Sequence, residues 1–102
     1  MKQNMYAIFD TCSGVYDGPI PGKADAHVIR SFSDLAVNAD HPIGKHPEHY
    51  ALVKVGQWND STGEITDYQN TTMITGLEAV AQAKGIVKDL DEGEVVSFGG
   101  TN

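Results

Sequence analysis

Three histidines stand close together in the sequence and could bind a metal. His41, His46 and His49 fall within nine residues, and imidazole is a common ligand of Zn²⁺ and other transition metals. Pro42 and Pro47 lie between them, which equally fits a polar loop that leads into a strand. Because no carboxylate or cysteine stands at a recognised ligand spacing, we predict no metal site and no cofactor.

The remaining reactive groups do not indicate an enzyme. Cys12 is the single cysteine and lies in a predicted turn, where nothing in the sequence marks it as a nucleophile. The chain contains no glycine-rich phosphate loop, no nucleophile elbow and no paired-carboxylate motif. We therefore expect a protein without catalytic residues.

Aromatic and basic side chains provide the chemistry of a binding surface. Aromatic rings on a sheet, beside basic side chains, can stack the bases of single-stranded nucleic acid. Strand aromatics also commonly fill the core, and that alternative stays open. The candidate nucleic-acid interface consists of Tyr16, Arg30, Lys45, Tyr50, Lys54 and Trp58.

The charge distribution limits this interpretation. The formal net charge is −7, which disfavours non-specific attraction to nucleic acid. Residues 1–55 carry five basic residues against six acids, whereas residues 56–102 carry two against eight. The acidity therefore belongs mainly to the second half, and local charge matters more than the total for a binding face.

Length and composition predict one small domain. The 102 residues are 40% hydrophobic and 21% charged, as in an ordinary globular protein. We expect a single domain over residues 1–88 and an acidic, glycine-containing tail over residues 89–102. No run approaches the roughly 18 apolar residues of a membrane span, and one cysteine fits an intracellular protein.

Residues 49–65 give the strongest strand signal, and the fold is expected to be built around them. Alternation places Tyr50, Leu52, Lys54, Gly56 and Trp58 on one side of this strand. The other side carries a compact apolar row, Ala51, Val53 and Val55. Residues 59–63 are turn formers, and Gly63 can take the positive φ that closes a hairpin.

The other elements follow from periodicity and chain breakers. We predict strands over residues 5–10 and 15–16, and prolines and glycines that interrupt regular structure over residues 17–22. A helix is expected over residues 24–38, a loop over 39–47, and a second short helix near 77–84 that ends at Gly85. Residues 71–75 extend or follow the return strand, and residues 95–98 form an edge strand or a mobile peptide.

Together these elements predict an α+β fold. It is a small antiparallel sheet with one main helix on one face, in the order β-β-α-β-β, followed by the short helix and the acidic tail. Phe32 should be buried together with Val53 and Val55. A small sheet has unpaired edges, and a homodimer is a common way to cover them.

Several short segments in order resemble one family. They are Tyr6-Ala7-Ile8-Phe9-Asp10, Ser13-Gly14-Val15-Tyr16 with Pro19 after it, Ile29-Arg30-Ser31-Phe32 leading to Asn38, and His46-Pro47 before Tyr50-Ala51-Leu52-Val53-Lys54-Val55-Gly56-Gln57-Trp58 with Gly63 after it. Over residues 5–66 the chain resembles the small non-structural protein of gokushoviruses, which are single-stranded DNA phages of the Microviridae.

The resemblance implies a phage protein made in the cytoplasm of the infected bacterium and absent from the virion. It implies a role in viral genome synthesis, at the switch from duplex replication to single-stranded DNA for packaging. Single-stranded DNA would then be the partner, with a viral or host replication protein as a further one. The alternative is an adaptor that contacts replication or assembly proteins through its acidic tail and binds no DNA.

Overall fold

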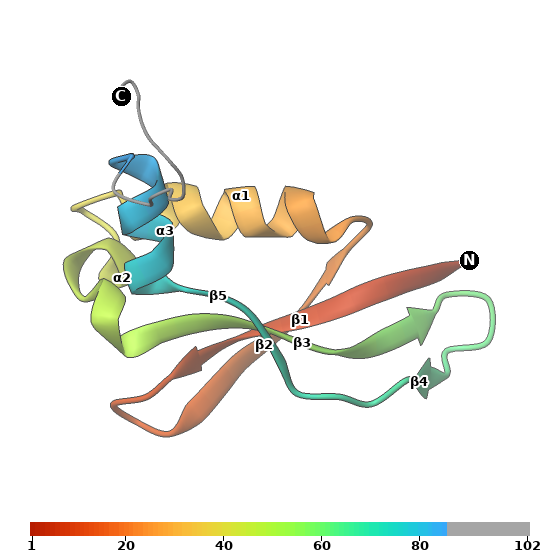
Figure 1. Cartoon of the computed structure of the whole chain (residues 1–102). Coiled ribbons are helices and arrows are strands. Elements are labelled where there is room, and N and C mark those ends of the chain that lie inside the picture. The colour runs from red at the N-terminus through yellow and green to blue at the C-terminus, as the bar shows by residue number, and fades with distance from the viewer. Residues whose placement is uncertain (86–102) are drawn as a thin grey trace.

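The computed structural model describes residues 1–85 and confirms the α+β fold, with a curled antiparallel sheet and helices on one of its faces (Figure 1). The strands are β1 (Lys2–Asp10), β2 (Val15–Gly22), β3 (Tyr50–Asn59), β4 (Ile65–Thr66) and β5 (Thr71–Thr75). The helices are α1 (Asp25–Ala36), α2 (Pro42–Lys45), the 3-10 helix η1 (Pro47–His49) and α3 (Gly76–Ala83). The predicted boundary after residue 88 and the predicted segment 95–98 lie outside the described residues.

Strand β3 is the centre of the sheet, as its sequence predicts. It pairs with β1 over its whole length, from Tyr50 opposite Asp10 to Asn59 opposite Lys2. Its other edge pairs with β4 and β5, so the strand order is β2-β1-β3-β4 with β5 also beside β3. The turn after β3 contains Gly63 at a φ of 75°, which confirms the predicted positive φ.

The two predicted helices are present with small shifts in their ends. Helix α1 lies within the predicted range 24–38 and packs on the sheet. Helix α3 begins with a capping box, in which the Thr75 hydroxyl accepts from the Glu78 amide and the Glu78 carboxylate accepts from the Thr75 amide. Gly85 follows this helix at a φ of 69°, the left-handed geometry expected after a helix end.

Two segments that prolines were expected to keep irregular are in fact regular. Residues 17–22 continue strand β2, which is possible because β2 is an edge strand that pairs with β1 alone, so its prolines interrupt no second ladder. The predicted loop 39–47 contains α2 and the start of η1. Pro42 and Pro47 occupy first-turn positions there, where a missing amide hydrogen costs nothing.

The core lies on the opposite face of β3 from the one predicted. Phe32 is 2% exposed and belongs to one cluster with Tyr6, Leu52 and Ile74. Val53 is buried but does not belong to this cluster, and Val55 is only half-buried. The prediction that Phe32 packs with Val53 and Val55 is therefore wrong, because α1 covers the face that carries Leu52.

The described part of the chain, residues 1–85, contains no helix that is both long enough and apolar enough to cross a membrane.

Candidate nucleic-acid interface

A bulge in β3 decides which side chains share a face. Met5 lies opposite Gly56 and Tyr6 lies opposite Lys54, so Val55 is an extra residue with no partner in β1. One extra residue reverses the alternation of side chains beyond it. Lys54 therefore lies on the helix side with Tyr6, whereas Trp58 lies on the other side with Met5.

The structure consequently separates the six residues of the predicted interface. Tyr50 packs against the core on the helix side, where Lys54 also lies. Arg30 is exposed on α1, and Lys45 is exposed on α2. Only Trp58 and Tyr16 lie on the face of the sheet away from the helices. The prediction that Tyr50, Lys54 and Trp58 share one face is wrong.

Lys54 is held by an ion pair and is not free to meet a phosphate. Its Nζ lies 3.2 Å from Asp25 Oδ1, and Asp25 also accepts a hydrogen bond from the Tyr6 hydroxyl. That hydrogen bond is the main cause that lowers the pKa of Asp25, and Lys54 lowers it further. Burial and the bond to Asp25 raise the pKa of Tyr6 to about 12. This network joins α1 to the sheet.

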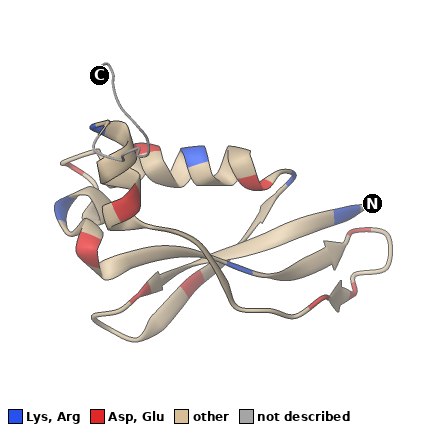
Figure 2. Cartoon of the chain, in the orientation of Figure 1, with Lys and Arg blue, Asp and Glu red and all other residues tan. Residues whose placement is uncertain are grey.

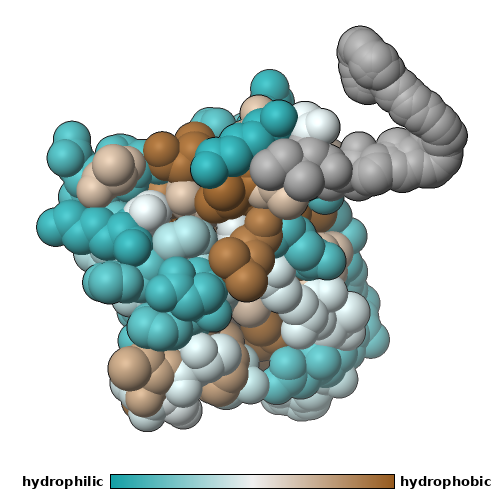
Figure 3. All heavy atoms as spheres, turned by 60° about the vertical axis from the view of Figure 1, so that its left-hand side comes forward, coloured by the Kyte–Doolittle hydropathy of each residue, from teal (hydrophilic) through white to brown (hydrophobic). Residues whose placement is uncertain are grey.

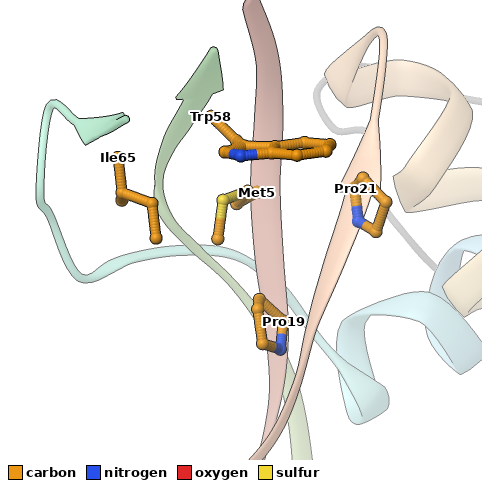
Figure 4. A pocket seen from close by; sticks show the side chains of 5 residues that line it. All are labelled: Met5, Pro19, Pro21, Trp58 and Ile65. Atoms are coloured by element: carbon orange, nitrogen blue, oxygen red, sulfur yellow. The ribbon is translucent and has the colours of Figure 1, made fainter. Parts of the chain in front are cut away.

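The sheet face away from the helices, which we call the open face, contains two adjacent apolar hollows. One has a volume of about 270 Å³ and is lined by Met5, Pro19, Pro21, Trp58 and Ile65. In Figure 4 the indole ring of Trp58 lies between Ile65 on one side and Pro21 on the other, with Met5 below it. Residues from β1, β2, β3 and β4 therefore meet around the half-buried ring of Trp58.

The second hollow, of about 340 Å³, extends the open face along the sheet. Its lining adds Ala7, Tyr16, Gly18, Val55 and Tyr68 to residues of the first. The Tyr16 ring lies 4.5 Å from the Phe9 ring, and the Tyr16 hydroxyl accepts a 2.7 Å hydrogen bond from the Asn70 side chain. This bond joins β2 to the segment before β5, so the sheet curls around the hollow.

The charges lie around the open face and not within it. The side chains that line the two hollows are all uncharged. Lys2, at the start of β1, precedes the residue that pairs with Trp58, and Lys23 directly follows β2. Asn4 pairs with Gly22, which directly precedes Lys23, so both lysines lie near the N-terminal end of β1, where Figure 2 shows basic segments. The described chain thus combines an apolar, aromatic face with two lysines near one end.

Sequence reasoning missed most of this face. Met5, Pro19, Pro21 and Ile65 were not assigned to it, and neither were Lys2 and Lys23. The two prolines predict a break in regular structure, although prolines are also common on edge strands. The Val55–Gly56 pair was the only available sign of a bulge, since a glycine within a strand often marks one.

Comparison with known families agrees with part of the resemblance found from the sequence. The family model described as "Phage ORF5 protein" matches residues 3–80, which covers most of the described structure. The chain belongs to the phage ORF5 protein family and is a bacteriophage protein. Neither the comparison with curated proteins nor that with solved structures found a match.

Proposed function

We propose that this phage protein binds single-stranded DNA on its open face and acts in viral genome synthesis, or in the switch from duplex replication to packaging. The observation that carries the proposal is the gathering of Tyr16, Trp58 and Tyr68 on one uncharged face of the sheet. The resemblance to the gokushovirus protein supports the same role, in the cytoplasm of the infected cell and outside the virion.

Stacking would supply most of the affinity. Base stacking on an aromatic side chain contributes roughly 1–3 kcal/mol per base and tolerates any sequence. Tyr68 is 79% exposed and Tyr16 is 45% exposed, so both rings offer surface to a ligand without refolding. Trp58 lies half-buried in the neighbouring hollow, where an unpaired base could lie against its ring.

Phosphate contacts would be few. Lys2 and Lys23 are exposed at the Trp58 end, whereas Lys54 is engaged with Asp25. Each phosphate contact to a single strand adds about 0.7 to the slope of log affinity against log salt. We therefore expect a slope of roughly 1.4 or less, a weak salt dependence for a DNA-binding protein.

Fluorescence anisotropy tests the proposal, with labelled single-stranded and duplex oligonucleotides of equal length at two salt concentrations. Single strands should bind more tightly, and bases stacked on Trp58 should quench its emission. Because Trp58 is the only tryptophan in the chain, this signal reports on the open face alone. Trp58→Ala and Tyr68→Ala should each weaken binding by roughly 5- to 150-fold, which corresponds to the stacking energies above.

Two controls separate binding from folding. Leu77→Ala removes an exposed apolar side chain on α3, outside the open face, and should leave DNA affinity unchanged. Lys54→Ala should also preserve affinity, although it can lower stability. If Trp58→Ala and Tyr68→Ala melt normally and still bind DNA like the unmodified protein, the open face is not the DNA site.

An adaptor that binds an apolar protein segment is the second candidate. The uncharged lining of both hollows favours it, as does the balance of 14 acidic against 7 basic residues. It predicts no binding of single-stranded DNA at low salt by the unmodified protein, in the same anisotropy experiment. The two functions are thus distinguished before any variant is made.

A further inference from the structure

A cluster of side chains that could bind a metal ion lies at the other end of β3, at η1. His46, Glu48 and His49 offer one ligand atom each, and these three atoms all lie within 4.8 Å of one another. Glu48 Oε2 is 3.9 Å from His46 Nδ1 and 3.8 Å from His49 Nε2. The carboxylate oxygen therefore lies close to both imidazole nitrogens.

The backbone of the turn explains this convergence. Side chains three residues apart in a 3-10 helix lie one above the other, and His46 directly precedes the helix that ends at His49. Their rings are stacked, with centroids 5.6 Å apart and planes inclined by 22°. The His49 amide donates to the His46 carbonyl oxygen at 3.0 Å, which closes the turn.

Two neighbouring segments hold this turn in place. The Thr11 amide donates to the His49 carbonyl oxygen at 2.8 Å, and the Thr11 hydroxyl donates to the same atom at 3.2 Å. Gly76, the first residue of α3, packs so closely that a β-carbon there would stand 2.1 Å from the Pro47 carbonyl oxygen. A ligand would therefore meet a backbone that is already positioned.

We propose that His46, Glu48 and His49 form a Zn²⁺ site. Two imidazole nitrogens and one carboxylate oxygen are a donor set that zinc uses when a fourth position stays open, and Mg²⁺ and Ca²⁺ instead prefer oxygen ligands. Zinc ligands lie about 2.0–2.2 Å from the ion, so tetrahedral ligands stand roughly 3.4 Å apart. The two His–Glu separations need to shorten by about half an ångström, and the two imidazole nitrogens, which lie within 4.8 Å of each other, by at most about 1.4 Å.

The side chains can make that adjustment because they are accessible. Their exposed fractions are 63% for His46, 49% for Glu48 and 40% for His49. Figure 3 brings this end of the molecule forward and shows a largely hydrophilic surface, crossed by a narrow apolar strip. The site is separate from the open face, and its existence does not depend on DNA binding.

Isothermal titration of ZnCl₂ into tag-free full-length protein tests the proposal. We expect one Zn²⁺ per chain and a melting temperature that rises with zinc concentration, since a ligand of the folded state stabilises it. His46→Ala and His49→Ala should each weaken zinc binding at least about tenfold, and so should Glu48→Gln, because each removes one of three ligands.

His27→Ala is the matched control, because His27 is an exposed histidine on α1 away from the cluster. It should bind zinc like the unmodified protein. All four variants should melt normally in metal-free buffer, since the altered side chains are at least partly exposed. Failure of the unmodified protein to bind zinc overturns the proposal, and so does undiminished binding by the double variant His46→Ala/His49→Ala.

Discussion

At the scale of single residues, the hydrogen bond from Tyr6 to Asp25 has a clear consequence for stability. The Tyr6 ring is fully buried, and its hydroxyl donates to a carboxylate that also pairs with Lys54. Hydrogen bonds to charged groups contribute about 1.5–3 kcal/mol, but Asp25 is 41% exposed and water can replace the lost donor. Tyr6→Phe should therefore lower the free energy of unfolding by about 1 kcal/mol near neutral pH. Urea denaturation of both proteins measures this difference.

The same contact should make the free energy of unfolding depend on pH. The pKa of Tyr6 rises from 10.0 in the unfolded chain to about 12 in the fold, so its stabilisation is complete below pH 10 and disappears towards pH 12. The pKa of Asp25 is lowered, so its contribution disappears as pH falls below the ordinary range of an aspartate. The advantage of the unmodified protein over Tyr6→Phe should shrink at both extremes. An advantage that grows above pH 10 would contradict this assignment.

At the residue scale, the sequence could not show which face of the sheet each side chain of β3 occupies. Trp58 and Tyr16, which were predicted to belong to one aromatic surface, both line the open face, whereas the strand residue Tyr6 is fully buried. Lys54 was assigned to that surface only because strict alternation was assumed through Val55. The bulge that breaks the alternation depends on how β1 pairs with β3, and residues some 50 positions away cannot be aligned from local pattern.

At the scale of elements, two truncations show which face of β3 carries the core. Phe32→Ala should cost about 3–5 kcal/mol, because the ring is almost fully buried between α1 and the sheet. Val55→Ala should cost about 1 kcal/mol or less, since this side chain is half-buried on the open face. Chemical denaturation of both variants provides the comparison. Equal losses would restore the core that the sequence had predicted.

The existence of the elements was more predictable than their packing. Helix α1 has an apolar stripe, and β3 is a long run of β-formers, so both could be recognised from local sequence alone. Prolines misled the interpretation of β2 and of the segment before β3, because the effect of a proline depends on its position. On an edge strand, or in the first turn of a helix, the missing amide hydrogen breaks no bond.

At the scale of the whole molecule, the structure restricts which surface two copies could use to form the predicted homodimer. Strand β2 is one edge of the sheet, but it carries Pro19 and Pro21, and prolines oppose the addition of another strand. If two copies associate, we expect them to use a surface other than β2. Light scattering should give about twice the 11.0 kDa chain mass, and a constant single-chain mass over a wide concentration range would contradict a dimer.

The pairing of β1 with β3 also has a consequence for the order in which the chain can fold during synthesis. Every residue from Lys2 to Asp10 that pairs with β3 has its partner between Tyr50 and Asn59, so β1 waits for some 40–50 further residues before β3 has been synthesised. At about 5–20 residues per second, that delay lasts seconds, whereas a hairpin forms in microseconds. Strands β1 and β2 can thus pair early, but the free edge of β1 stays unpaired until β3 adds beside it and brings Leu52 under α1.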